Sequence, residues 1–271
     1  MTIQIYLNSD VADVKLNSSQ NSSLLFYLRN PIVPPDGFQM SIKVVNCAIP
    51  CSFYLVNSQN NKLVISGTTY TLTSGNYTAY SLSDLIATAT SGFVSVAFST
   101  VTSKYTLTSL TNFAINKEST CQKLLGLPTG TDLASSGYSL SSSYPIDLSG
   151  DNMLHLAVRN LQMQNMLGGA KTSILKALPV SVSQGGVLFY DDNSGSSGFV
   201  IHEDHVGFLH VVLYGEDATT LIDLQNARWS VTLEINFIKK QEYFVAGKSF
   251  RELYDKYLQS VQTAPAKLSQ N

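Results

Sequence analysis

The stretch RWSVTLEINFIKK, residues 228–240, alternates polar and apolar side chains over its first ten residues, 228–237. Successive side chains of a β-strand point to opposite faces, so strict alternation predicts one long strand with a single face in a hydrophobic core. The core face would carry Trp229, Val231, Leu233, Ile235 and Phe237. The other face would carry Arg228, Ser230, Thr232, Glu234 and Asn236.

Similar stretches rich in β-branched and aromatic residues recur along the chain, as in IQIYLN (3–8), FQMSIKVVNCAI (38–49), LHLAVRN (154–160) and FLHVVLY (208–214). Turn-forming stretches separate them, including NPIVPPDG (30–37), DDNSGSSG (191–198) and GEDAT (215–219). Short strands at this spacing are typical of an all-β fold. We therefore predict an antiparallel two-sheet β-sandwich.

Two short helices are predicted between residues 57 and 138. SLSDLIATA (81–89) begins with a capping pair, Ser81 and Asp84, and STCQKLLGLP (119–128) begins with Ser119 and Gln122 and stops at Gly126. Mixed with hairpins, these helices predict an α/β module, 57–138, inserted into a sandwich formed by 1–56 and 139–240.

The C-terminal part, 241–271, is predicted to hold an amphipathic helix and a tail. Ser249 and Glu252 form a capping box, and one stripe carries Phe250, Leu253, Tyr254, Tyr257, Leu258 and Val261. A helix of about three turns is marginal in water, so the stripe must dock. It can dock on its own sandwich or on a neighbouring subunit.

The composition argues against a protein that coats nucleic acid, because the formal net charge is -2 and the pI is near 6.1. Charged residues make up 13% of the chain, about half of the usual ~25%. A surface poor in charge is weakly protected against self-association, which favours a protein packed among neighbours.

Cys47, Cys51 and Cys121 are odd in number, so they do not form a disulfide framework. Cys47 and Cys51 could be half of a metal site, but without a second Cys/His pair at suitable spacing we interpret all three as buried packing thiols. The start MTIQIYLNSD lacks a basic n-region, and no apolar run approaches the roughly 20 residues of a membrane-spanning helix. We expect a soluble protein in a reducing compartment.

The densest group of possible metal ligands is HEDH, His202–His205, followed by His210. The strand-like flanks favour a solvated turn over a metal site, and His210 is expected in the core or at an interface. GGAKTS (168–173) and DDNSGSSG depart from phosphate-binding and calcium-binding loops, and no Gly-x-Ser-x-Gly occurs. We predict no catalytic residues, no metal and no cofactor, with Asp147, Asp223 and Glu234 as turn caps or outward-facing residues.

Three stretches together resemble the minor capsid, or penton, proteins of virophages, polintons and polinton-like viruses. They are SYPIDLSGDNMLHLAVRNL (143–161), LIDLQNARWSVTLEINFI (221–238), and the segment from GNYTAYSLSDLIATA (75–89) through KYTLTS (104–109) to CQKLLGLP (121–128). The resemblance implies a single jelly roll. It also implies a structural protein, five copies of which close each vertex of an icosahedral shell built mainly from double jelly-roll major capsid proteins.

In that family the protein resides in the virion after synthesis in the host cytoplasm or a virus factory. The resemblance implies a homopentamer with major capsid neighbours, without a cofactor. The C-terminal segment would then serve as an inter-subunit or shell-anchoring contact through Phe250, Leu253, Tyr254, Tyr257 and Leu258.

Two other functions remain open from the sequence. A glycan-binding or adhesin-type sandwich could present Tyr70, Tyr77, Tyr80 and Tyr105 as a face for stacking on sugar rings. A cupin-like metal enzyme could use His202 and His205, although the cupin pattern of two histidines separated by one residue is missing.

Overall fold

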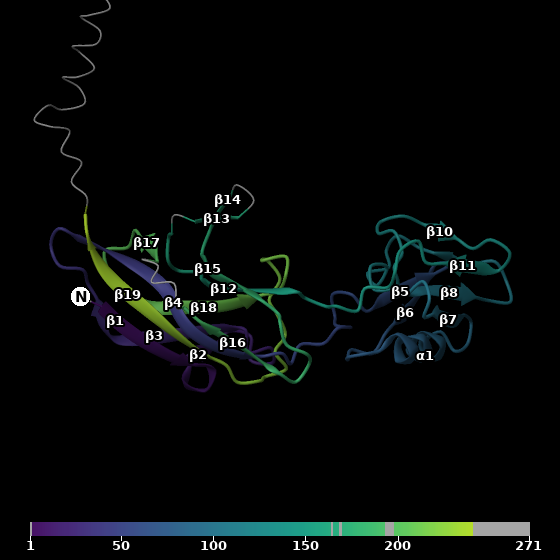
Figure 1. Ribbon diagram of the computed structural model, residues 1–271, viewed down its shortest axis with the longest axis horizontal. Helices are drawn as coiled ribbons and strands as arrows, with labels where there is room; N and C mark the ends of the chain where they lie inside the picture. The colour runs from purple at the N-terminus through teal and green to yellow at the C-terminus, as the bar shows by residue number, and fades with distance from the viewer. Residues whose placement is uncertain (1, 164, 168–169, 193–197, 241–271) are drawn as a thin grey trace, which may run out of the picture.

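The computed structural model describes residues 2–163, 165–167, 170–192 and 198–240. Two parts lie end to end along the long axis of the molecule (Figure 1). One is a sandwich of two antiparallel sheets that contains the N-terminus. The other is a smaller module that lies beyond one end of the sandwich.

Five strands form the first sheet of the sandwich: β1 (Thr2–Asn8), β19 (Ser230–Lys239), β4 (Phe38–Pro50), β16 (Val187–Asp191) and β17 (Phe199–Ile201). Their order is β1-β19-β4-β16, with β17 also paired to β4. The second sheet has the order β15-β12-β18-β3-β2. These strands are β15 (Ile174–Pro179), β12 (Met153–Val158), β18 (Val206–Tyr214), β3 (Ser23–Ile32) and β2 (Val14–Lys15).

The strand order of the sandwich is that of a jelly roll. When β16 and β17 count as one strand and the short β2 is set aside, eight strands follow in the order β1, β3, β4, β12, β15, β16/17, β18, β19. The first sheet then joins strands one, eight, three and six, and the second joins two, seven, four and five. All of these pairs are antiparallel. The predicted all-β antiparallel jelly-roll sandwich is therefore confirmed.

The core of the sandwich lies between the two sheets and receives the alternating face of β19. Trp229, Val231, Leu233 and Ile235 are all at most 2% exposed, whereas Phe237 is half-buried and packs against the same core. On the other face Thr232 is also buried, because β19 is a central strand and Thr232 lies between its partners Tyr6 and Asn46.

The chain between β4 and β12 builds a second hydrophobic core of its own. One small sheet contains β5 (Lys62–Ile65), β6 (Thr68–Thr71), β9 (Ala114–Ile115) and β10 (Leu133–Ala134). Another contains β7 (Ser95–Ser99), β8 (Lys104–Thr108) and β11 (Ser139–Ser141), and α1 (Ala79–Ala89) packs against β7. The second core begins with Leu55, and Leu140, Ile146 and Leu148 pack against it. We keep the division at 57 and 138 as a proposal.

The first predicted helix exists but starts earlier than expected. Thr78 is the N-cap of α1, and its side chain and that of Ser81 bond each other's backbone N–H groups in a capping box. Asp84 therefore does not form the cap. The hydroxyl of Thr78 accepts the N–H of Ser81, which is the usual way to satisfy a free helix-start donor.

The second predicted helix, over 119–128, is wrong, because this segment forms successive turns. The N–H groups of Thr120 and Cys121 both donate to the carbonyl of Lys62 in β5, which ties the chain to a sheet edge. Gly126 ends the turns with φ +65, a left-handed conformation that favours glycine.

The remaining elements are short. They are the 3-10 turn η1 (Ser9–Val11) and the strand pair β13 (Asn165–Leu167) and β14 (Ala170–Thr172). Among the described residues, none of the helices is long and apolar enough to cross a membrane. The predicted C-terminal helix and its residues Phe250, Leu253, Tyr254, Tyr257 and Leu258 lie outside the described residues.

Candidate functional site

The outer face of the first sheet combines polar side chains with two exposed aromatic rings. Tyr6 on β1 is 73% exposed, and Phe189 on β16 is 77% exposed. Tyr6 pairs with Thr232 of β19, and Phe189 pairs with Ala48 of β4. We call this surface the Phe189 face, formed by the outward side chains of β1, β19, β4 and β16.

An ion-pair network lies on the Phe189 face. The Nζ atom of Lys43 is 3.5 Å from a carboxylate oxygen of Asp192 and 3.5 Å from one of Glu234. The side-chain amide of Asn236 donates to Glu234, and this bond, aided by Gln4 and Lys43, lowers the pKa of Glu234 despite some burial. One lysine against two carboxylates gives the network a net negative charge. Glu234 points outward from the core, in the position that the alternation predicts.

The outer face of the second sheet also presents aromatic side chains. Tyr27 of β3 is 57% exposed and Phe208 of β18 is 39% exposed, and their ring centroids are 6.1 Å apart. Val14 of β2 is exposed at the edge of the same sheet, beside Leu25. We call this surface the Tyr27 face, formed by the outward side chains of β2, β3, β18 and β12.

His210 lies on the Tyr27 face rather than in the core. One ring nitrogen, Nε2, is 2.9 Å from the hydroxyl oxygen of Ser23. Burial lowers the pKa of His210, and the nearby positive charge of Arg159 lowers it further. A lowered pKa favours the neutral imidazole, and its hydrogen bond to Ser23 fixes the orientation of the ring on the Tyr27 face.

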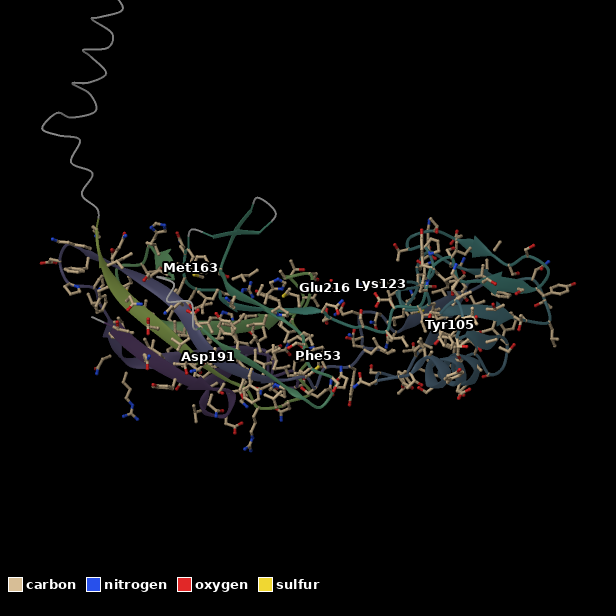
Figure 2. All side chains as sticks on the ribbon, viewed as in Figure 1. Phe53, Tyr105, Lys123, Met163, Asp191 and Glu216 are labelled. Atoms are coloured by element: carbon tan, nitrogen blue, oxygen red, sulfur yellow. The ribbon has the colours of Figure 1, made fainter. Side chains whose placement is uncertain are left out.

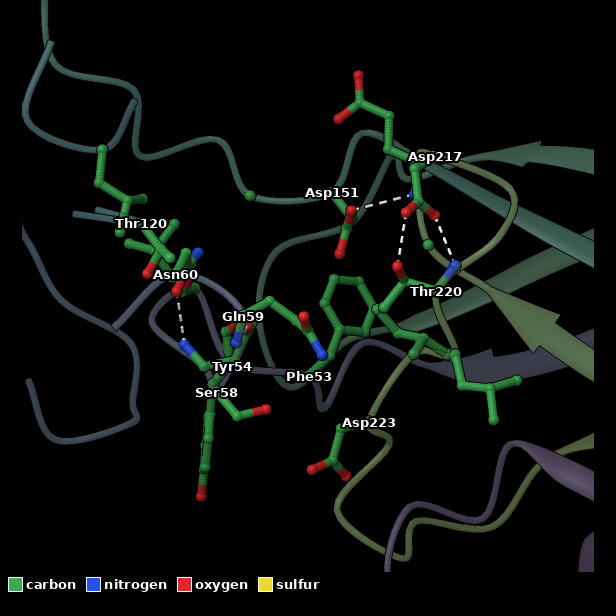
Figure 3. A pocket seen from close by; sticks show the side chains of 18 of the residues that line it. Phe53, Tyr54, Ser58, Gln59, Asn60, Thr120, Asp151, Asp217, Thr220 and Asp223 are labelled. Carbon is green, nitrogen blue, oxygen red and sulfur yellow. Dashed lines mark hydrogen bonds between the residues drawn. The ribbon is translucent and has the colours of Figure 1, made fainter. Parts of the chain in front are cut away.

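A cavity of about 540 Å³ lies between the sandwich end and the module. Figure 2 shows Phe53 and Glu216 at the end of the sandwich and Lys123 on the module side. The close view in Figure 3 shows Asp151, Asp217 and Asp223 around it. The charged residues of the lining are Lys123, Asp147, Asp151, Glu216, Asp217 and Asp223, so acids dominate.

Most of these acids stabilise turns by accepting hydrogen bonds from backbone N–H groups two or three residues later. Asp217 accepts bonds from the backbone N–H and hydroxyl groups of Thr219 and Thr220, which lower its pKa to about 2 although burial opposes this. Asp147 and Asp223 each accept the N–H of the residue two positions later. Burial raises the pKa of Asp151, and the negative charges of Glu216 and Asp217 also raise it, although the hydrogen bond from the backbone N–H of Glu216 opposes this. Within the described part of the chain, the His, Cys, Asp and Glu residues do not come together as a metal-binding group.

The stretch from His202 to His205 is a loop between β17 and β18. Glu203 accepts the backbone N–H of Gln162, and the backbone N–H of His202 donates to the carbonyl of Gln162. These bonds join the loop to Gln162, which lies just after β12 in the same chain. The carboxylate of Glu203 therefore holds the loop in place.

The three cysteines are buried and are not joined in disulfides. Burial raises the pKa of Cys47 to about 11 and that of Cys121 to about 12. Burial also raises the pKa of Cys51. Such thiols stay protonated at neutral pH and pack like small apolar side chains.

The four tyrosines of the expected sugar-binding face do not share one exposed surface. Tyr105 is fully buried, and its hydroxyl donates to the carbonyl of Ala79 at 2.6 Å. Tyr80 is exposed, whereas Tyr70 and Tyr77 are half-buried. The prediction of a joint tyrosine face is therefore wrong, since Tyr105 is a core residue of the module.

Sequence reasoning missed the exposed rings on the two outer faces. The signal was present in β1, where Tyr6 has the same parity as Gln4 and Asn8 and so belongs to the polar face. Phe208 likewise shares its parity with His210 in β18. An aromatic residue in the polar register of an alternating strand is a sign of a contact surface.

No protein-family model and no curated protein matches this chain. Among solved structures, the crystal structure of a mavirus penton protein is 9% identical, with a TM-score of 0.48, over 88% of this chain and 100% of that chain. A chain in the cryo-EM structure of the Sputnik virophage is 14% identical, with a TM-score of 0.39, over 88% of this chain and 98% of that chain.

Proposed function

We propose that this chain is a structural capsid protein that forms the pentameric vertex, or penton, of an icosahedral shell. The observation that carries the proposal is the complete jelly-roll strand order within one chain, because jelly rolls are a recurrent architecture of viral capsid proteins. The low charge of the sequence and the exposed rings on both outer faces support an assembled state.

Jelly rolls also occur in cupins and lectins, so the side chains between the two sheets must distinguish a capsid protein from a cupin-like enzyme. Here the space between the sheets is filled by apolar side chains, among them Trp229, Leu233 and Ile235. A cupin-like enzyme would need metal ligands in that space. We propose a structural role without catalysis and without a cofactor.

The two ends of the sandwich suggest an orientation in the shell. β19 ends at Lys239, at the end of the sandwich that lies opposite the module (Figure 1). We propose that the module projects outward and that segment 249–271 contacts the shell or a neighbouring subunit. The proposed contact residues are Phe250, Leu253, Tyr254, Tyr257 and Leu258. The neighbours in the shell would be double jelly-roll major capsid proteins, in a virion assembled in the host cytoplasm or a virus factory.

Sedimentation equilibrium of the purified full-length chain tests the homopentamer. Five copies of the 29.5-kDa chain should sediment at about 148 kDa. A monomer at all protein concentrations would contradict the pentamer. Co-expression with the major capsid protein and imaging of the particles should place this protein at the vertices, and its presence elsewhere or its absence would contradict the capsid role.

Truncation after Lys248 tests the C-terminal contact. We expect the melting temperature of the truncated chain to stay close to that of the full chain, while the pentamer or its incorporation into particles is lost. An unfolded truncated chain would instead show that the segment stabilises its own sandwich, and unchanged assembly would show that it is dispensable.

A further inference from the structure

We propose that neighbouring copies meet head to tail, with the Tyr27 face of one copy against the Phe189 face of the next. This inference rests on the proposed pentamer. A closed ring of five identical subunits has only heterologous contacts, so each subunit must offer two different surfaces that fit each other. The two outer faces of the sandwich are different surfaces of one subunit and can supply such a pair, provided that the flanking loops incline the contact enough to close a ring of five.

Both faces carry large rings where solvent-facing sheets normally carry polar side chains. Tyr27 and Phe208 contact each other across neighbouring strands, so they form one apolar spot rather than two scattered residues. Tyr6 and Phe189 lie on strands at opposite sides of the first sheet and frame the polar strip between them. Aromatic side chains are enriched where protein interfaces bury their centres.

The charges of the two faces are complementary. The Phe189 face carries Lys43 and the exposed Arg228 together with the acids Asp191, Asp192 and Glu234, and Arg228 pairs with Asp10 at the edge of the face. The side chains of Lys43, Asp192 and Glu234 are only 16%, 5% and 16% exposed, so they contribute mainly through the net negative charge of the face. The Tyr27 face carries the exposed Arg29 and Arg159, with Asp13 bonded to the backbone of Tyr27.

These charges also decide between head-to-tail and face-to-face contact. Contact between two Tyr27 faces would bring together two surfaces of net positive charge, and contact between two Phe189 faces would bring together two surfaces of net negative charge. Head-to-tail contact places net positive against net negative charge, so complementarity favours it and disfavours both symmetric dimers.

The size of the faces sets what they can contribute. Strands that lie about 4.8 Å apart and rise about 3.3 Å per residue give each sheet face an area of roughly 400 Å². This is about half of the ~800 Å² that each partner buries in a stable interface. The flanking loops must supply the rest. The rings therefore belong near the centre of the contact, where their removal should have the largest effect.

The arrangement also has a consequence for the modules. The long strands run roughly along the line that joins the sandwich to the module (Figure 1). Subunits that pack through sheet faces would stand side by side with parallel long axes, and all five modules would lie at the same end of the ring.

Two full-length variants test the inference. The first removes the rings of the Tyr27 face, Tyr27→Ser with Phe208→Ser, and the second removes those of the Phe189 face, Tyr6→Ser with Phe189→Ser. All four side chains are exposed, so both variants should keep the wild-type melting temperature. A matched control, Leu110→Ser with Val101→Ser, removes exposed apolar residues from the module instead.

By sedimentation, each face variant should raise the concentration at which the pentamer dissociates by more than about tenfold, and the control should not. An equimolar mixture of the two face variants should form heterodimers, because each pair has one intact Tyr27 face and one intact Phe189 face. Pentamers that persist in either face variant would overturn the inference while leaving the proposed penton intact. A wild-type protein that never forms a pentamer would overturn the proposed function as well.

Discussion

Replacing Trp229 by Ala tests the core position predicted from the alternating strand. The Trp229 side chain is 2% exposed, and its indole N–H donates to the carbonyl of Asn21 at 2.7 Å. Removing a buried Trp costs roughly 3–5 kcal/mol. The Asn21 carbonyl loses its indole donor as well, which can add ~1 kcal/mol or more. Against a total stability of about 5–15 kcal/mol, this is a large share.

Urea unfolding followed by far-ultraviolet circular dichroism measures the loss, because Trp229 is the single Trp of the chain and its fluorescence vanishes with it. Trp229→Phe is the matched control: it keeps most of the ring area but loses the indole donor, so we expect roughly 1–3 kcal/mol. A loss below about 1 kcal/mol for Trp229→Ala would show that the side chain is not buried as described. Equal losses for both variants would refute the separation into packing and hydrogen bonding.

Gly126→Ala should lower the free energy of unfolding by roughly 2–5 kcal/mol, because φ is +65 and a Cβ atom would overlap the carbonyl oxygens of Tyr144 and Pro145. Gly130→Ala, with φ +71 and open space, should cost only about 1–2 kcal/mol, and equal losses in thermal melts would contradict the clash. In the folded protein, hydrogen bonds hold the pKa of Asp217 at about 2, below the 3.8 of a free Asp side chain. Asp217→Asn should therefore remove stability that the wild type has above pH 4 and loses as the pH falls toward 2. Asp151→Asn should have the opposite sign and leave stability at pH 7 equal or higher, since the folded state raises this pKa; unfolding curves at pH 2–7 check both. Tyr105→Phe should lose about 1 kcal/mol in urea unfolding, because Ala79 also accepts other bonds, and a loss above ~3 kcal/mol would contradict this.

The sandwich was predictable because burial on one side imposes a period of two on a strand, and in β19 the core face carries the buried Val231, Leu233 and Ile235. Thr232 on the other face is buried as well, because its neighbours in the sheet cover it. The helix over 119–128 failed for a different reason. Its caps and apolar spacing suit a helix, but the turns end at Gly126 (φ +65), where the N–H of Leu127 donates back to the carbonyl of Gln122, so too few residues remain for a helix. The N–H groups of Thr120 and Cys121, which a helix start leaves free, donate to Lys62, far away in sequence. Local patterns do not reveal such a partner.

The candidate contact faces were predictable only in part. Each ring could be recognised as an aromatic residue in a polar register, as for Tyr6 in β1. Which rings share a face depends on pairing between strands that are distant in sequence. Tyr27 meets Phe208 only because β3 pairs with β18, and the alternation of either strand alone does not encode that pairing.

The position of the module follows from the jelly-roll path itself. β4 and β12 are consecutive strands of opposite sheets, so the chain between them must cross the end of the sandwich whatever its length. Lengthening such a connection from about five residues to about 100 costs roughly 2–3 kcal/mol in closure entropy, which a separate hydrophobic core can offset. Because the module leaves from an end and not from a face, its growth leaves the Tyr27 and Phe189 faces uncovered. Changes in the projecting module can thus occur without disturbing the proposed contacts between subunits.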